Sequence, residues 1–205
     1  MPLAPQTAHQ KELGWKYKMS ANSNGGARIY QTDLRNEIIF DPANFSNINL
    51  DPTQRQGVDF DFSQRMTPSW TVSGIFSVRE AHFSNGQYGG NTIPMSPKQV
   101  ASIRSDWKIA AHQSIGIKFT SVAQQQISGD FVNQQSMPGY STADVRYGYK
   151  FENAELSVLI RNIFDRTYYS YATNAYDASS SYLRYTSVYP DQRRSIMAQF
   201  KWNFR

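Results

Sequence analysis

The stretch RSIMAQFKWNF, residues 194–204, decides the fold class of this chain. Its apolar residues fall on every second position, at Ile196, Ala198, Phe200, Trp202 and Phe204. The residues between them are polar, with the exception of Met197. Because successive side chains of an extended strand point to opposite faces, this pattern predicts a strand with one apolar and one polar face. Large aromatic residues at the end of the apolar face are typical of strands that leave lipid and meet water.

Eight further segments are predicted to be strands, and all but one show the same alternation. They cover residues 13–19, 27–38, 58–63, 70–78, 101–109, 115–119, 143–151 and 156–160. The exception is 27–38, which reads as extended but alternates poorly. None of the alternating apolar faces carries a charge, whereas nearly every polar face does. The sequence therefore predicts an all-β chain of about nine antiparallel strands.

The composition leaves few other protein classes open. At 205 residues, the chain is 40% hydrophobic and carries a net charge of +5 that is spread along its length. No apolar run is long enough for a membrane helix, but a membrane β-barrel fits, because half of each barrel strand faces a polar lumen. No basic stripe with interleaved aromatics occurs, so nucleic-acid binding is not expected. The absence of cysteine is compatible with a periplasmic or cell-surface location.

The connections between the predicted strands alternate between short and long. The short ones cover residues 20–26, 64–69, 110–113 and 152–154, and the long ones cover 40–54, 81–98, 123–140 and 163–193. This alternation is typical of an up-and-down barrel of the outer membrane, with tight periplasmic turns and longer extracellular loops. The short turns then share one rim with a set of aromatic residues: Tyr17, Phe62, Trp70, Trp107, Tyr149, Phe151, Trp202 and Phe204. We interpret this set as an interfacial aromatic girdle, which places the C-terminus in the periplasm.

A soluble barrel or sandwich is the alternative interpretation of the same strands. Its strands would have the same period of two, with the apolar faces turned inward around a core. The aromatic girdle, the asymmetry of the connections and the uncharged apolar faces favour the membrane barrel.

Four motifs follow one another along the chain in an order that is known from one family. They are ELGWKY at 12–17, DLRNEIIFDP at 33–42 with NLD at 49–51 and RQGV at 55–58, VLIRNIFDRTYY at 158–169, and YP at 189–190 followed by Arg193 and Arg194. Each resembles a strand signature of the TonB-dependent outer-membrane receptors, and together they span nearly the whole chain.

This resemblance implies a fold and a function. Receptors of this family have a barrel of about 22 strands with a plugged lumen. They bind an iron chelate, haem, cobalamin or a similar scarce nutrient and import it with energy that TonB relays. This chain would supply about nine strands of the C-terminal part of the barrel, as residues 10–205, with residues 1–9 as a leader or loop remnant. The expected partners are outer-membrane lipid, the remaining barrel strands, the plug domain and, through that plug, TonB.

The chain shows neither a plug domain nor an export signal, so we expect a receptor fragment, a truncated product or one part of a split receptor. An open sheet edge in lipid leaves unpaired backbone groups, each of which costs several kcal/mol. The alternative function is a small outer-membrane barrel that stands alone, as a passive pore or a surface-binding protein.

No catalytic or metal-binding pattern stands out. His9, His82 and His112 lie at no metal-ligand spacing, so neither a metal, a cofactor nor an enzymatic activity is expected. The close pair Asp59 and Asp61 is expected to be balanced by cations on a neighbouring strand.

Ligand contacts are expected near the extracellular ends of the strands. Arg79 and Arg161 lie near the extracellular ends of inward-facing rows of side chains and could meet an anionic chelate. Ion pairing within the lumen is the simpler interpretation. Tyr168, Tyr169 and Tyr171 begin a tyrosine-rich connection. Tyrosine offers rigid contact area with a hydroxyl, which suits a bulky amphipathic ligand. These tyrosines could equally form the extracellular aromatic girdle.

Overall fold

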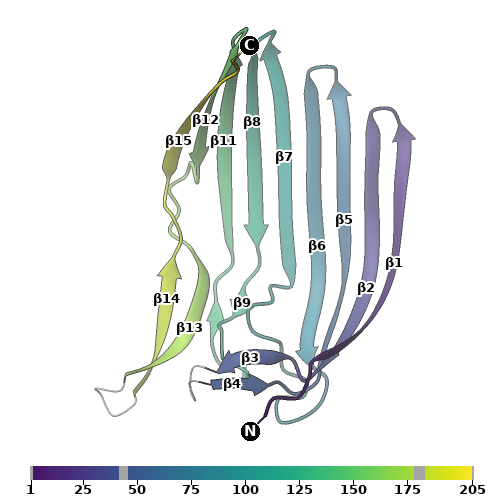
Figure 1. Ribbon diagram of the computed structural model, residues 1–205, viewed down its shortest axis with the longest axis vertical. Coiled ribbons are helices and arrows are strands. Elements are labelled where there is room, and N and C mark those ends of the chain that lie inside the picture. Colours follow the sequence, from purple (N-terminus) through teal and green to yellow (C-terminus); the bar gives the residue numbers. More distant parts are fainter. Residues whose placement is uncertain (1, 42–45, 178–182, 205) are drawn as a thin grey trace.

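The computed structural model describes residues 2–41, 46–177 and 183–204, and its main feature is one antiparallel sheet of nine strands (Figure 1). In their order across the sheet, the strands are β1 (Thr7–Ser20), β2 (Ser23–Arg35), β5 (Thr53–Thr67), β6 (Trp70–Phe83), β7 (Gln99–Ala110), β8 (Gln113–Val122), β11 (Tyr140–Lys150), β12 (Ala154–Arg161) and β15 (Ser195–Trp202). This sheet confirms the predicted all-β, antiparallel fold. The described residues include no helix that is long and apolar enough to cross a membrane.

Short and long connections alternate along the sheet, as predicted. The short turns cover residues 21–22, 68–69, 111–112 and 151–153, and the long connections cover 36–52, 84–98, 123–139 and 162–194. The short turns and the C-terminus lie at one end of the strands, and the long connections and the N-terminus lie at the other (Figure 1).

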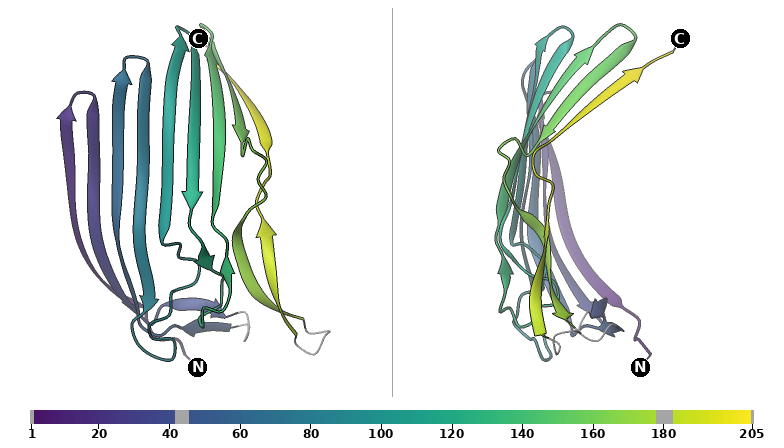
Figure 2. Two further views of the ribbon diagram at one scale, coloured as in Figure 1. Left: turned by 180° about the vertical axis from the view of Figure 1, so that it is seen from behind. Right: turned by 90° about the vertical axis from the view of Figure 1, so that its left-hand side faces the viewer.

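Three of the long connections contain hairpins. These are β3 (Ile38–Asp41) with β4 (Ser46–Asn49), β9 (Gln125–Gln126) with β10 (Ser136–Met137), and β13 (Tyr169–Asp177) with β14 (Leu183–Pro190). The sheet is bowed along its strands, and the β3–β4 hairpin lies toward its concave side (Figure 2). Residues 42–45, which include the end of the DLRNEIIFDP motif, lie outside the described residues.

The predicted strand 27–38 is wrong at both ends. It ends early because Asn36 has a φ of 58°, which breaks the extended conformation, so that Ile38 begins β3. It starts earlier because Gly25 and Gly26, predicted to be a loop, belong to β2. Glycine is needed there for space: a Cβ on Gly25 would lie 2.7 Å from the Tyr17 hydroxyl oxygen. Glycine within a strand can therefore mark the close approach of a neighbour and not only a turn.

The N-terminal residues are tied to the rest of the structure. β1 begins at Thr7, so three residues of the expected leader lie in the first strand. Before it, the Ala4 backbone N–H donates to Asn49 Oδ1 over 2.8 Å, and Asn49 Nδ2 donates to the Ala4 carbonyl over 3.0 Å.

The strand register joins the apolar faces of all nine strands into one surface. Leu13 pairs with Ile29, Ile29 with Val58, and Val58 with Val78. These side chains remain accessible: 63% of Leu13, 50% of Ile103 and 59% of Phe200 are exposed. An exposed apolar surface of this extent needs a partner, and lipid fits a sheet whose apolar residues gather mainly on one face.

Aromatic pairs line the short-turn end of this surface. The rings of Trp70 and Trp107 stack with centroids 5.9 Å apart, and those of Phe200 and Trp202 lie 6.1 Å apart. This is the arrangement predicted for the interfacial girdle.

The buried core lies among the long connections and not behind the sheet. One cluster consists of Leu50, Ala81, Phe83 and Ile93. It joins the 36–52 connection, the end of β6 and the 84–98 connection. Phe83 is fully buried, and its ring meets the edge of Phe131 with centroids 5.8 Å apart. A second cluster consists of Ile127, Met137 and Ala172 and joins the β8–β11 connection to β13. The long connections therefore pack together as one body.

The lipid-facing assignment predicts a strong asymmetry between adjacent positions of β7. Ile103→Arg would place a charge on the exposed apolar face and is expected to lower the free energy of unfolding by about 2–4 kcal/mol. Ser102→Arg, on the polar face next to it, is the matched control and is expected to have little effect. Urea titration in lipid vesicles measures both, and equal destabilisation would contradict the assignment.

The loop core predicts a second contrast. Phe83→Ala removes a fully buried ring and is expected to cost about 3–5 kcal/mol of local stability. Phe164→Ala is the control, because 77% of Phe164 is exposed. Limited proteolysis of the long connections in vesicles checks this: faster cleavage at residues 84–98 and 123–139 is expected for Phe83→Ala alone.

Candidate ligand-binding site

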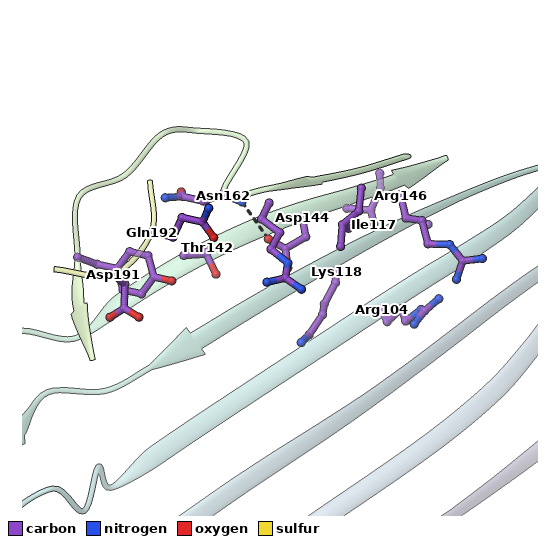
Figure 3. Close-up of a pocket in the computed structure, with 13 residues that line it drawn as sticks. Arg104, Ile117, Lys118, Thr142, Asp144, Arg146, Asn162, Asp191 and Gln192 are labelled. Carbon is purple, nitrogen blue, oxygen red and sulfur yellow. Dashed lines mark hydrogen bonds between the residues drawn. The ribbon is translucent and has the colours of Figure 1, made fainter. Parts of the chain in front are cut away.

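The polar face of the sheet contains a cavity of about 550 Å³ near the long connections (Figure 3). Its charged lining residues come from four adjacent strands and one connection: Arg104, Lys118, Asp144, Arg146, Arg161 and Asp191. The strand residues among them share one face because each occupies the inward position of the strand alternation. A cavity of this size is within the usual range for small-molecule sites.

Two of the four cations in the cavity have carboxylate partners. Arg104 Nε lies 2.6 Å from Asp106 Oδ2 on the same strand. Gly116, across from this pair, leaves it room, since a Cβ there would lie 2.7 Å from Asp106 Oδ1. Arg146 Nη2 lies 3.9 Å from Glu155 Oε1.

The other two cations have no such partner. Within residues 2–41, 46–177 and 183–204, neither Lys118 nor Arg161 forms a salt bridge. The two carboxylates of the cavity are instead engaged by backbone groups. The Asn162 N–H donates to Asp144 Oδ1 over 2.9 Å, and the Ser170 N–H donates to Asp191 Oδ2 over 2.6 Å. With Asp106 and Glu155 counted, the four cations of the cavity are matched by four carboxylates.

A turn at residues 162–165 shapes one wall of the cavity. Asn162 and Asp165 have φ values of 49° and 53°, a conformation that asparagine and aspartate tolerate better than most residues. The Asn162 side chain bonds the backbone of Arg166 twice, as donor over 2.8 Å and as acceptor over 3.0 Å. This turn ends β12 and turns the chain toward Tyr168.

Asp165 joins the same turn to the start of β15. Its Oδ2 lies 2.7 Å from Arg193 Nη2, and its Oδ1 accepts the Arg194 backbone N–H over 3.0 Å. The Arg194 N–H and, after it, the Arg193 guanidinium lower the pKa of the Asp165 carboxyl.

Tyr168 supplies an aromatic wall with a neutral hydroxyl. Its ring lies against that of Tyr140 with centroids 4.5 Å apart, and its carbonyl accepts the Asp191 N–H over 3.0 Å. Burial and then the Asp191 carboxylate raise the pKa of the Tyr168 phenol. The hydroxyl therefore stays protonated at neutral pH and can donate a hydrogen bond.

The structure brings only two of the five predicted ligand contacts together. Arg161 and Tyr168 line the cavity. Tyr169 packs against the second buried cluster, and Tyr171 meets Tyr189 with ring centroids 5.3 Å apart.

Arg79 lies in a separate cavity of about 550 Å³ with Tyr30, Gly57 and Lys98. Its Nε is buried and has no hydrogen-bond partner among the described residues. The ion pairing expected as the simpler interpretation is not seen within the described chain for either Arg79 or Arg161. Asp59, in contrast, pairs with Arg28 of the neighbouring strand, as predicted. Asp61, for which the same was expected, forms no salt bridge among the described residues.

Sequence reasoning missed Lys118 and Asp191 as neighbours of Arg161. The alternation along β8 indicates that the Lys118 side chain is on the polar face. Which residues lie beside it depends on the register with β11, where Lys118 is opposite Asp144. The position of Asp191 depends on the path of the long connection 162–194. The described residues contain no group of three or more potential metal-ligating side chains.

Comparison with known proteins identifies the family. Residues 1–163 match the family model "TonB dependent receptor-like, beta-barrel". The chain belongs to the TonB-dependent receptor β-barrel family. Members of this family are outer-membrane proteins. This confirms the resemblance that the four motifs indicated.

Individual relatives agree in fold and differ in cargo. The chain is 24% identical over 193 residues to a probable TonB-dependent siderophore receptor, PiuA, of Acinetobacter baumannii, covering 86% of this chain and 25% of that protein. The crystal structure of the ferric yersiniabactin uptake receptor FyuA from Yersinia pestis superposes with a TM-score of 0.82 at 21% identity, covering 98% of this chain and 30% of that one. The copper transporter OprC gives a TM-score of 0.78 at 18% identity, covering 98% and 32%.

Two facts limit what these relatives imply. The chain spans about a quarter of the length of the PiuA relative, so most of such a receptor has no counterpart in it. The named proteins are receptors and transporters, not enzymes, which supports the expectation of a non-enzymatic function.

The junction at Asp165 predicts a pH-dependent local stability. Because its pKa is depressed in the folded state, its contribution is present above the ordinary aspartate pKa of about 3.9 and is lost as the pH falls through the lower folded value. Asp165→Asn is therefore expected to speed hydrogen exchange at residues 191–194 at neutral pH, with a difference from wild type that shrinks in acid. Glu152→Gln, in a short turn, is the control. An effect of equal size at every pH would contradict this role.

Proposed function

We propose that this chain forms the C-terminal wall of a larger outer-membrane barrel that takes up a ferric siderophore or a similar scarce nutrient with energy from TonB. The observation that carries the proposal is the apolar surface shared by nine strands in a chain of this family. That surface suits lipid, and the polar face opposite it suits the lumen of a receptor.

The proposed orientation places the short turns and the C-terminus in the periplasm and the long connections outside the cell. The cavity with Arg161 and Tyr168 then lies toward the extracellular end of the lumen. Arg79, Tyr169 and Tyr171 remain proposed ligand contacts at the same end. An iron chelate, haem or a cobalamin-type molecule would meet these residues from outside.

The remaining partners follow from the sheet edges and the polar face. Among the described residues, β1 and β15 lie at opposite edges and do not pair with each other. Unpaired strand edges are not tolerated in lipid. Further barrel strands would cover these edges, a plug domain would fill the lumen, and TonB would act through that plug. The open edges also argue against a small barrel that stands alone.

An immunoblot of outer-membrane fractions with an antibody against residues 195–204 tests the proposal first. A band several times larger than this 205-residue chain is expected. Iron uptake from labelled chelates in cells that carry this larger protein is then expected to cease when TonB is deleted or the proton gradient is collapsed.

Two outcomes would contradict the proposal. The first is an outer-membrane band at the size of the chain alone, with steady ion conductance by the purified chain in planar bilayers. That result would support a passive pore. The second is uptake that continues unchanged without TonB.

A further inference from the structure

We propose that the polar face of the sheet, next to the short turns, docks an acidic protein surface that lies in the lumen of the complete barrel. The inference rests on the proposed function, because it takes the polar face as the inner wall of a larger barrel whose lumen holds a further domain. It adds the charge that this domain presents to the wall and the lysines that contact it.

The net charge of the chain is concentrated on one face of the sheet. The strand register places thirteen lysine and arginine residues and six aspartate and glutamate residues on the polar face. All other positions together have eight and ten such residues, respectively. The polar face therefore has an excess of seven positive charges, whereas the whole chain has only five. Charges that are spread along the sequence gather in space because the alternation of each strand turns them to the same side.

This excess is greatest at the short-turn rim, by which we mean the polar-face positions among the last five strand residues before each short turn or the C-terminus. The rim has seven cations and two carboxylates, Asp106 and Glu155, and the short turns add only Glu152. Six of the cations form no salt bridge within the described residues and are exposed: Lys16, Lys18, Arg65, Lys108, Lys150 and Lys201.

The cross-strand neighbours of these cations do not neutralise them. Neutral residues lie directly opposite three of them: Asn24 opposite Lys18, Thr71 opposite Arg65, and Ser114 opposite Lys108. Glu155 lies opposite both Lys150 and Lys201, and its Oε1 is also 3.9 Å from the Arg146 guanidinium. One carboxylate thus serves three cations, and Asp106 is already in contact with Arg104.

The position of the rim indicates what covers it. Lipid does not, because the apolar surface that suits lipid is on the opposite face of the sheet. A domain in the lumen that packs on the rim removes water from its charges, and an unpaired charge in such an interface costs several kcal/mol. Carboxylates on that domain would instead accept charged hydrogen bonds from the lysines. The fixed pattern of charges would also favour one orientation of the domain.

Chemical cross-linking tests the contact directly. Isolated outer membranes that contain the intact protein are treated with a water-soluble carbodiimide, which joins a lysine amine to a touching carboxylate as an amide and leaves as a urea. Mass spectrometry is expected to find Lys16, Lys18 or Lys108 joined to aspartate or glutamate residues outside these 205 residues. Lys11 is the control, because it lies on the same strand as Lys16 but on the opposite face. It is expected to form no such link.

Charge reversal tests the energetic contribution of the rim. Lys16→Glu combined with Lys108→Glu, in the intact protein, is expected to speed proteolysis of the lumen domain by about 10-fold, as for the loss of one charged hydrogen bond. Cleavage follows the population of the opened domain. Lys11→Glu combined with Arg35→Glu reverses as many charges on the opposite face and is expected to have no effect. The difference is expected to shrink at high salt, because exposed charges are screened.

Three results would overturn the inference while the larger protein is present in the membrane. They are the absence of rim-lysine links to residues beyond this chain, equal proteolysis of the two double variants, and a steady anion-selective conductance of the intact protein, which would show a rim that faces water. Heat-modifiable gel mobility shows whether each variant is folded. Absence of any protein larger than this chain would overturn the proposed function instead.

Discussion

The absence of water from the bilayer core is the constraint on which the rest of this structure depends. Backbone groups in lipid must pair with one another, and a sheet achieves this only along its interior strands. The backbone groups of the nine strands pair with one another in long antiparallel ladders. One example is the ladder between β5 and β6, which runs from the pair Thr53–Phe83 to the pair Thr67–Trp70. Their apolar side chains then need no protein partner, which explains why Leu13 and Ile196 remain so exposed. Among the described residues, the outer edges of β1 and β15 have no partner strand, so the backbone pairing is incomplete there.

The same constraint divides the molecule into two parts with different sources of stability. In the sheet, lipid replaces a protein core, and tight cross-strand contacts set the register, as where the Phe62 ring lies over Gly74. Beyond the membrane, water surrounds the chain and the ordinary hydrophobic effect applies. The long connections therefore contain the buried clusters around Phe83 and Ile127. The cavity at the boundary of the two parts has a floor of strands and a wall formed by the connections.

The turn at residues 162–165 links these two parts. Its Asn162 and Asp165 adopt left-handed conformations that end β12, and their side chains bond backbone groups on both sides of the 162–194 connection. This places Tyr168 and Asp191 beside Arg161, although the two lie far apart along the chain. Residues of the VLIRNIFDRTYY motif thus form one wall of the cavity, a role that could not be inferred from the sequence of the motif.

The sequence by itself determined the strands, their two faces, the alternation of connections and the family, because each depends on local periodicity or on a short motif. It misplaced the start of β2, since a glycine under the Tyr17 ring and a glycine in a turn look alike along the chain. Only the tertiary structure decided that Arg161 and Tyr168 share a cavity while Arg79, Tyr169 and Tyr171 lie elsewhere. The reason is that the cavity depends on register across four strands and on the path of one long connection. Neither of these is encoded by any single segment.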